Sequence, residues 1–204
     1  MRIQTYEICR LLIGICIYLS TSVAIAEEQQ SAAISVVEEL HAALISVMKD
    51  SATLGYQERY DQLKPVIELV FDTSLIAQVV LSRYWKELSE QQQTDFIKLF
   101  NRLSISTYAS RFDSYSDEVF ETKNVQELKK GRLLVQTELI RSNDKPVSLD
   151  YLMHKKDDRW YIISVIADGV NDLSLKRAEY ATIIKDSGFN KLVSDIEEKI
   201  RNNG

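Results

Sequence analysis

Cysteine is almost absent from the chain. Cys9 and Cys16 are the only two among 204 residues. Residues 27–204 therefore hold no thiol, which excludes disulfides, sulfur-ligated metals and cysteine nucleophiles from that part of the chain. Histidine is equally scarce, because only His41 and His154 occur and neither has a second histidine or cysteine at ligand spacing. We expect no metal site and no cofactor.

Proline, glycine and positive charge are also in short supply. Two prolines and six glycines are too few for a long disordered or low-complexity region. With 25 basic and 30 acidic residues the net charge is −5. Without residues 1–26, which hold two arginines and one glutamate, the counts become 23 and 29 and the net charge −6. A negative surface repels phosphate backbones and anionic membranes, so we expect no nucleic-acid partner and no permanent membrane binding.

The first 26 residues have the pattern of a secretory signal peptide. Arg2 and Arg10 supply a basic start, residues 11–19 (LLIGICIYL) form an apolar run, and residues 24–26 (AIA) are small at the exit. This pattern predicts cleavage before Glu27 and export to the periplasm.

An uncleaved membrane anchor is the alternative for the same segment. Polar residues 20–22 (STS) interrupt the apolar run before the roughly 20 residues that a membrane span needs. Cleavage would leave residues 27–204, a length that suits one domain with its own core and is short for two.

Six segments have the apolar spacing of amphipathic helices. They are residues 31–50, 56–71, 72–85, 90–112, 170–184 and 189–200. Asp72 is a candidate N-cap, and Ser89 with Gln92 forms a candidate capping box. Gly188 is expected to end a helix in the left-handed conformation, and Pro65 to begin a new helical turn.

Four segments between these helices have the pattern of β-strands. They are residues 119–122, 133–140, 147–154 and 160–167, rich in β-branched and aromatic residues and separated by turn-like sequences. We predict an α+β fold in which helices pack on one face of a curved four-stranded antiparallel sheet. Such a layer can leave a cone-shaped apolar cavity, similar in appearance to the NTF2-like folds.

Several motifs resemble the MlaC/toluene-tolerance family of periplasmic lipid-binding proteins. They are ADGV at 167–170, LKRAEY at 175–180, GFNKL at 188–192, and LSRYW at 81–85 followed by the Gln- and Phe-rich helix of residues 91–100. The resemblance covers about residues 36–200 and is greatest to the hopanoid-associated HpnM branch.

The resemblance implies a non-enzymatic carrier of phospholipid or hopanoid cargo. Its implied partners are an inner-membrane lipid transporter complex and an outer-membrane acceptor of the lipoprotein or porin type. The family's pocket lies between sheet and helices. We therefore predict that the protein is a monomer and that it carries bound lipid when it is purified.

The residues expected to line this pocket follow from strand and helix alternation. They are Val80, Leu99, Leu103, Leu133, Val135, Leu139, Val147, Leu149, Tyr151, Met153, Ile163, Val165 and Val170. Periodicity alone favours the alternative that they form a solid core, and only the family resemblance favours a cavity. Arg111, Lys176 and Arg177 are candidates for contact with a lipid phosphate, with solvated surface charge as the alternative.

Two rival functions remain open. One is a small-substrate enzyme on a cone-shaped α+β fold, with Tyr151 or Asp168 as a reactive group at the cavity. A turn or capping role for Asp168 is the simpler interpretation. The other is a non-catalytic envelope adaptor with a solid core.

Overall fold

The structure is a computed structural model that describes residues 4–142 and 144–204, with side chains from residue 27 onward. The predicted signal peptide and its cleavage site concern side chains outside this described part. The helices are α1 (Gln4–Lys49), α2 (Tyr56–Val70), α3 (Thr73–Leu81), the 3₁₀ helix η1 (Ser82–Glu87), α4 (Glu90–Arg111), α5 (Asp172–Ser187) and α6 (Phe189–Asn203). The strands are β1 (Val119–Leu128), β2 (Arg132–Ile140), β3 (Val147–Lys156), β4 (Arg159–Ala167) and β5 (Val170–Asn171).

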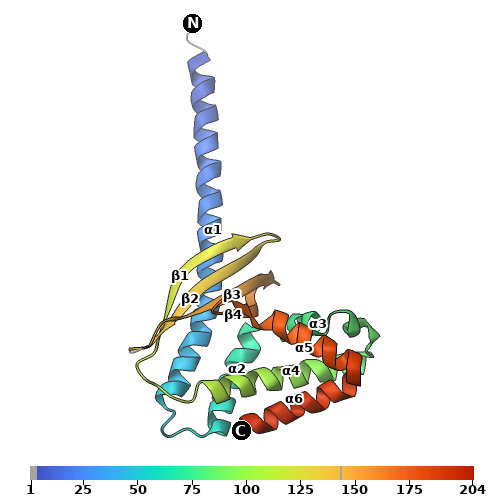
Figure 1. The fold of residues 1–204 in the computed structure, drawn as a ribbon. Helices are drawn as coiled ribbons and strands as arrows, with labels where there is room; N and C mark the ends of the chain where they lie inside the picture. Colours follow the sequence, from blue (N-terminus) through green and yellow to red (C-terminus); the bar gives the residue numbers. More distant parts are fainter. Residues whose placement is uncertain (1–3, 143) are drawn as a thin grey trace.

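The first helix is much longer than the sequence pattern predicts. It begins at Gln4 and not near Ser31, and its N-terminal half projects away from the rest of the molecule (Figure 1). The part from Glu27 to Lys49 is long and apolar enough, by length and composition, to cross a membrane. Val37, Leu40 and Leu44 in this part are fully buried, so core packing accounts for its apolar character.

The sheet is an antiparallel meander in the order β1-β2-β3-β4-β5. The α+β class is confirmed, but the predicted count of four strands is wrong by one. Asp168 and Gly169 both have positive φ (47° and 80°) and turn the chain tightly back on β4. This turn places Val170 in β5, where the sequence pattern predicts the start of a helix.

A register shift between β3 and β4 changes which residues of β4 share a face. Met153 pairs with Ile162 and Leu152 pairs with Ser164, which leaves Ile163 without a partner, as in a β-bulge. Val165 then pairs with Tyr151 and lies on the face of Ile162. Simple alternation would instead place Val165 on the face of Ile163.

The predicted capping residues occupy the positions expected of them. Asp72 Oδ1 accepts a hydrogen bond from Leu75 N (3.0 Å) at the start of α3. Ser89 and Gln92 form the reciprocal capping box of α4. Gly188 separates α5 from α6 with φ 85° and ψ 166°, a positive-φ conformation outside the left-handed helical region that the sequence predicts.

Two predicted helix features differ in the structure. Pro65 lies inside α2 and does not begin a new turn, so one backbone hydrogen bond of that helix is missing. The helix predicted to run to Trp85 leaves α-helical geometry at Ser82, whose φ is 52°, and continues as η1.

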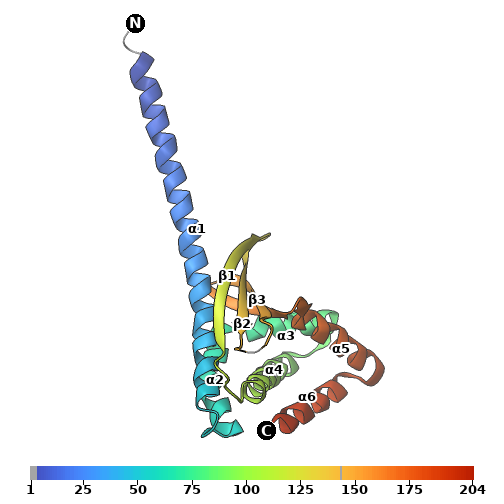
Figure 2. The same cartoon turned by 60° about the vertical axis from the view of Figure 1, so that its left-hand side comes forward.

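The helices form two clusters around the sheet. Figure 2 shows α1 beside the sheet and α3, α4, α5 and α6 grouped on the side away from α1. One core joins α1, α2 and the end of α4 to the sheet through residues such as Leu40, Ile105 and Met153. The second core joins α3, α4, α5 and α6 and includes Phe96 and Tyr180. Because α4 belongs to both cores, it fixes their relative position.

Candidate lipid-binding cavity

A cavity of about 630 Å³ lies between the sheet and the helices. Its wall combines the C-terminal half of α4, the ends of β2 and β4, the start of β3 and the first turns of α5. Aromatic side chains from the helical side include Phe71, Phe100, Tyr108 and Phe112, of which the last two rings are stacked at 5.7 Å. The volume is within the range of small-molecule and lipid pockets.

Eight of the thirteen residues predicted to line a pocket lie on the cavity wall. They are Leu103, Leu139, Val147, Leu149, Tyr151, Ile163, Val165 and Val170. The other five, Val80, Leu99, Leu133, Val135 and Met153, are buried in the two solid cores.

The strand residues on the cavity wall and those in the solid core differ in their position along the strands. Leu133, Val135 and Met153 share a sheet face with Leu139 and Leu149 by register. At their end of the strands, however, the sheet packs against α1 and α2. At the other end the helices do not close onto the sheet, and the cavity begins. Alternation predicts the face of a residue but not how far a helix covers the strand.

The helical aromatic residues on the wall were missed by the sequence analysis. Tyr108 and Phe112 are four residues apart, as are Phe96 and Phe100. This spacing places each pair on one helix face. The same pattern is typical of an ordinary helix core, so the sequence carried no signal that distinguishes a cavity wall.

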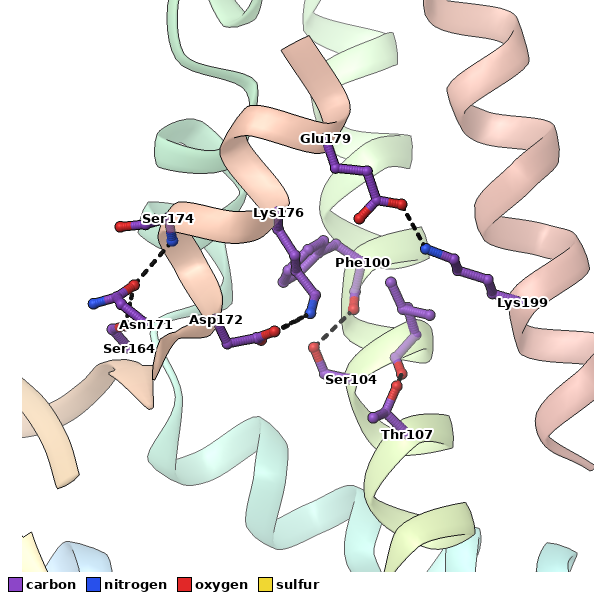
Figure 3. Close-up of polar contacts among 11 residues, drawn as sticks. Phe100, Ser104, Thr107, Ser164, Asn171, Asp172, Ser174, Lys176, Glu179 and Lys199 are labelled. Carbon is purple, nitrogen blue, oxygen red and sulfur yellow. Dashed lines mark hydrogen bonds and ion pairs between the residues drawn. The ribbon is translucent and has the colours of Figure 1, made fainter. Parts of the chain in front are cut away.

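Three serine and threonine hydroxyl groups on the wall donate hydrogen bonds within the protein (Figure 3). Ser104 Oγ donates to Phe100 O (3.0 Å), and Thr107 Oγ1 donates to Leu103 O (2.8 Å). Ser164 Oγ donates to Asn171 Oδ1 (3.2 Å), which also accepts from Ser174 N and caps α5. Since these three hydroxyl groups already donate hydrogen bonds, the wall at these positions can face hydrocarbon at little cost in free energy.

A histidine lies behind the wall at Tyr151. The hydroxyl of Tyr151 and Nε2 of His41 are 2.9 Å apart and form a hydrogen bond. His41 stacks on Phe120 with ring centroids 3.9 Å apart. Burial lowers the pKa of His41 to about 4, so the ring is neutral at physiological pH. Burial also raises the pKa values of Tyr151 and Tyr108, so both stay protonated phenols.

Charged groups gather where the cavity meets solvent. Lys176 Nζ contacts both carboxylate oxygens of Asp172 (2.6 and 2.8 Å; Figure 3). Arg111 also lies on the wall, whereas Arg177 is exposed and outside it. Val170 and Leu175 are 52% and 57% exposed on the same rim. An apolar rim with flanking charges suits an amphiphilic ligand.

Asp168 has a structural role in the turn. Its Oδ1 accepts from Ser148 N (3.0 Å), and its own N donates to Ser148 O (3.0 Å). These bonds fasten the β4–β5 turn to β3. Asp168 is not on the cavity wall. Among the residues described with side chains, no group of three histidine, cysteine or carboxylate residues could hold a metal.

The fold and the cavity define a class of protein: an α+β domain with a largely apolar cavity between a curved sheet and its helices. The chain belongs to the MlaC protein family, whose profile matches residues 38–198. No comparison distinguishes the HpnM branch within that family, which stays a prediction.

Two similar proteins agree with this membership. The intermembrane phospholipid transport system binding protein MlaC of Haemophilus influenzae is 24% identical over 123 residues, 58% of each chain. The chain thus spans little more than half the length of that relative. The phospholipid-binding protein of Ralstonia solanacearum, solved in complex with a phospholipid, has the same fold with a TM-score of 0.73 and 20% identity. That match covers 84% of this chain and 98% of the other.

Proposed function

We propose that the protein is a non-enzymatic periplasmic carrier that shelters the acyl chains of a phospholipid in its cavity. The observation that carries the proposal is the cavity of about 630 Å³ with its aromatic and aliphatic wall. The phospholipid named for the Ralstonia protein of the same fold and the transport role named for the Haemophilus relative support it.

The energetics of lipid in water explain why a carrier needs such a cavity. Each buried CH₂ group contributes about 0.8 kcal/mol. Exposure of one long acyl chain to water therefore costs on the order of 12 kcal/mol of free energy. Unassisted diffusion of the lipid between membranes is therefore very slow. A protein that replaces the membrane interior with its own wall removes this barrier.

The proposed cellular setting follows from the N-terminal segment and the family. Residues 1–26 act as a signal peptide cleaved before Glu27, and residues 27–204 form the single carrier domain. An inner-membrane lipid transporter and an outer-membrane acceptor exchange cargo with it, and the protein acts as a monomer. The cargo can be a phospholipid or a hopanoid, since both present an extended apolar body.

Extraction of the purified protein with organic solvent tests the proposal. Mass spectrometry of the extract is expected to find about one lipid molecule per protein. A Val147→Trp variant places an indole in the cavity and should lower the bound lipid severalfold. The control Gln126→Trp, on an exposed position of β1, should retain it. A stable wild-type protein without extractable lipid would contradict the carrier function.

A further inference from the structure

A second, smaller hollow of about 360 Å³ joins the apolar cavity. The described residues on its wall are all polar: Ser114, Ser116, Glu118, Arg141, Ser142 and Asp144. Ser114, Glu118 and Arg141 also line the apolar cavity, so the two spaces are contiguous. An amphiphile with its chains in the apolar cavity can therefore extend its polar end into this hollow.

Glu118 is the unusual residue of the polar hollow. Only 5% of it is exposed to solvent, an unusually low fraction for a carboxylate side chain. One carboxylate oxygen accepts from the backbone N of Ser116, and the other lies 3.5 Å from Nε of Arg141. A carboxylate with this little water gains strongly from any further cationic donor.

Arg141 contacts two carboxylates and can still donate a hydrogen bond to a further anion. Its Nη1 lies 3.8 Å from Oδ2 of Asp144, in addition to the 3.5 Å contact of Nε with Glu118. The side chain is 41% exposed. Within the described residues, Nη2 of Arg141 has no ion-pair or hydrogen-bond partner, so it can donate to a phosphate oxygen.

The charges of the hollow favour a zwitterion. One arginine and two carboxylates give the described wall a net charge of −1. A purely anionic headgroup adds repulsion, and a quaternary ammonium cannot donate hydrogen bonds to Glu118. A headgroup with a phosphate and a primary ammonium satisfies Arg141 and Glu118 together.

We propose that this polar hollow binds the lipid headgroup and selects one that carries a phosphate and a primary ammonium, as in phosphatidylethanolamine. The proposal rests on the proposed carrier function, because the acyl chains of the same lipid occupy the apolar cavity. The carboxylate of Glu118 accepts from the ammonium, and the guanidinium of Arg141 donates to the phosphate.

Lipid competition tests the selection. Delipidated protein is incubated with vesicles of equal phosphatidylethanolamine, phosphatidylcholine and phosphatidylglycerol content, and bound lipid is quantified by mass spectrometry. The wild-type protein is expected to enrich the ethanolamine lipid about fivefold over the choline lipid. Since these two lipids have the same net charge, their ratio reports hydrogen bonding by the ammonium.

Matched variants assign the selection to the hollow. Glu118→Gln keeps an acceptor for Ser116 N but removes the charge, and should bring the ratio close to one. Glu127→Gln removes the same charge from an exposed position of β1 outside both spaces and should retain the enrichment.

The outcomes separate the two proposals. Bound lipid that mirrors the vesicle composition in the wild-type protein overturns the headgroup proposal and leaves the carrier function standing. Enrichment that survives in Glu118→Gln overturns the assignment to this residue. If Glu118→Gln does not fold, the wild-type ratio alone decides. No bound lipid of any kind overturns both proposals.

Discussion

The contact between His41 and Tyr151 joins α1 to the sheet beside the cavity. His41 is 6% exposed and Tyr151 1%, and their hydrogen bond crosses 110 residues of sequence. Buried polar groups are costly without a partner, so each residue depends on the other. The sequence carries no signal for this contact, because no spacing rule links positions this far apart.

Acidification is expected to destabilise the protein through His41. Burial lowers its pKa to about 4 from 6.5, so the unfolded chain binds a proton at higher pH than the folded protein. The stabilisation is complete above pH 6.5 and is lost as pH falls towards 4. The loss between pH 7 and pH 5 should be about 2 kcal/mol, measured by urea unfolding.

A His41→Gln variant is the reference for this titration. It has no imidazole to protonate. Between pH 7 and pH 5 its free energy of unfolding should therefore fall by about 2 kcal/mol less than that of the wild-type protein. An equal pH dependence in both proteins would show that other groups cause the change.

Removal of the Tyr151 hydroxyl is expected to weaken the same contact. Tyr151→Phe leaves Nε2 of His41 buried without its partner and should lower the free energy of unfolding by about 1–2 kcal/mol at pH 7. Tyr161→Phe, at a partly exposed position on β4, should change stability by less than about 0.5 kcal/mol. Thermal and urea unfolding of both variants provide the measurement.

At the scale of elements, α5 lies against the second core with one of its faces. Tyr180 is its only fully buried residue, packed edge-on against Phe96 and Phe100. Positive-φ glycines, Gly169 and Gly188, lie close to its two ends. Its first turns form one wall of the cavity. The helix therefore links the second core to the cavity.

Two substitutions on α5 should separate stability from lipid retention. Tyr180→Ala removes the anchor in the second core and should cost about 3 kcal/mol of stability. Leu175→Ser changes an exposed rim residue, should alter stability by less than about 0.5 kcal/mol, and should speed lipid release severalfold. Unfolding curves and transfer of a fluorescent lipid to acceptor vesicles measure the two effects. Unchanged release in Leu175→Ser would exclude the rim from retention.

Elements with local signals were predicted well from the sequence. The caps at Asp72 and Ser89 are decided within three residues, so the starts of α3 and α4 were correct. The bulge at Ile163 and strand β5 were missed. Both depend on pairing with a neighbouring strand, and the residues that form them look like ordinary strand and helix residues.

For the whole molecule, an empty cavity would be a large cost. About 630 Å³ of dry volume corresponds to roughly 15 kcal/mol at 24 cal/mol per Å³, as much as the stability of an entire domain. Water at the open rim lowers this figure without removing it. Bound lipid is therefore expected to contribute to the stability of the folded state.

Delipidation should lower the unfolding temperature. A loss of about 3 kcal/mol corresponds to a decrease of roughly 10 °C for a chain of this size. Differential scanning calorimetry before and after lipid removal measures the shift, and reloading from vesicles should reverse it. An unchanged transition in a protein shown to be lipid-free would contradict a stabilising cargo.

The sequence by itself determined the α+β class, the two capping sites, the absence of thiols in residues 27–204 and, through its motifs, the family. These features depend on neighbours a few residues apart or on composition. Only the tertiary structure decided that Leu139 and Leu149 face a cavity while Leu133 and Met153, on the same sheet face, lie in solid core. The reason is that alternation orients a side chain, whereas the place where a helix leaves the sheet depends on packing between distant segments.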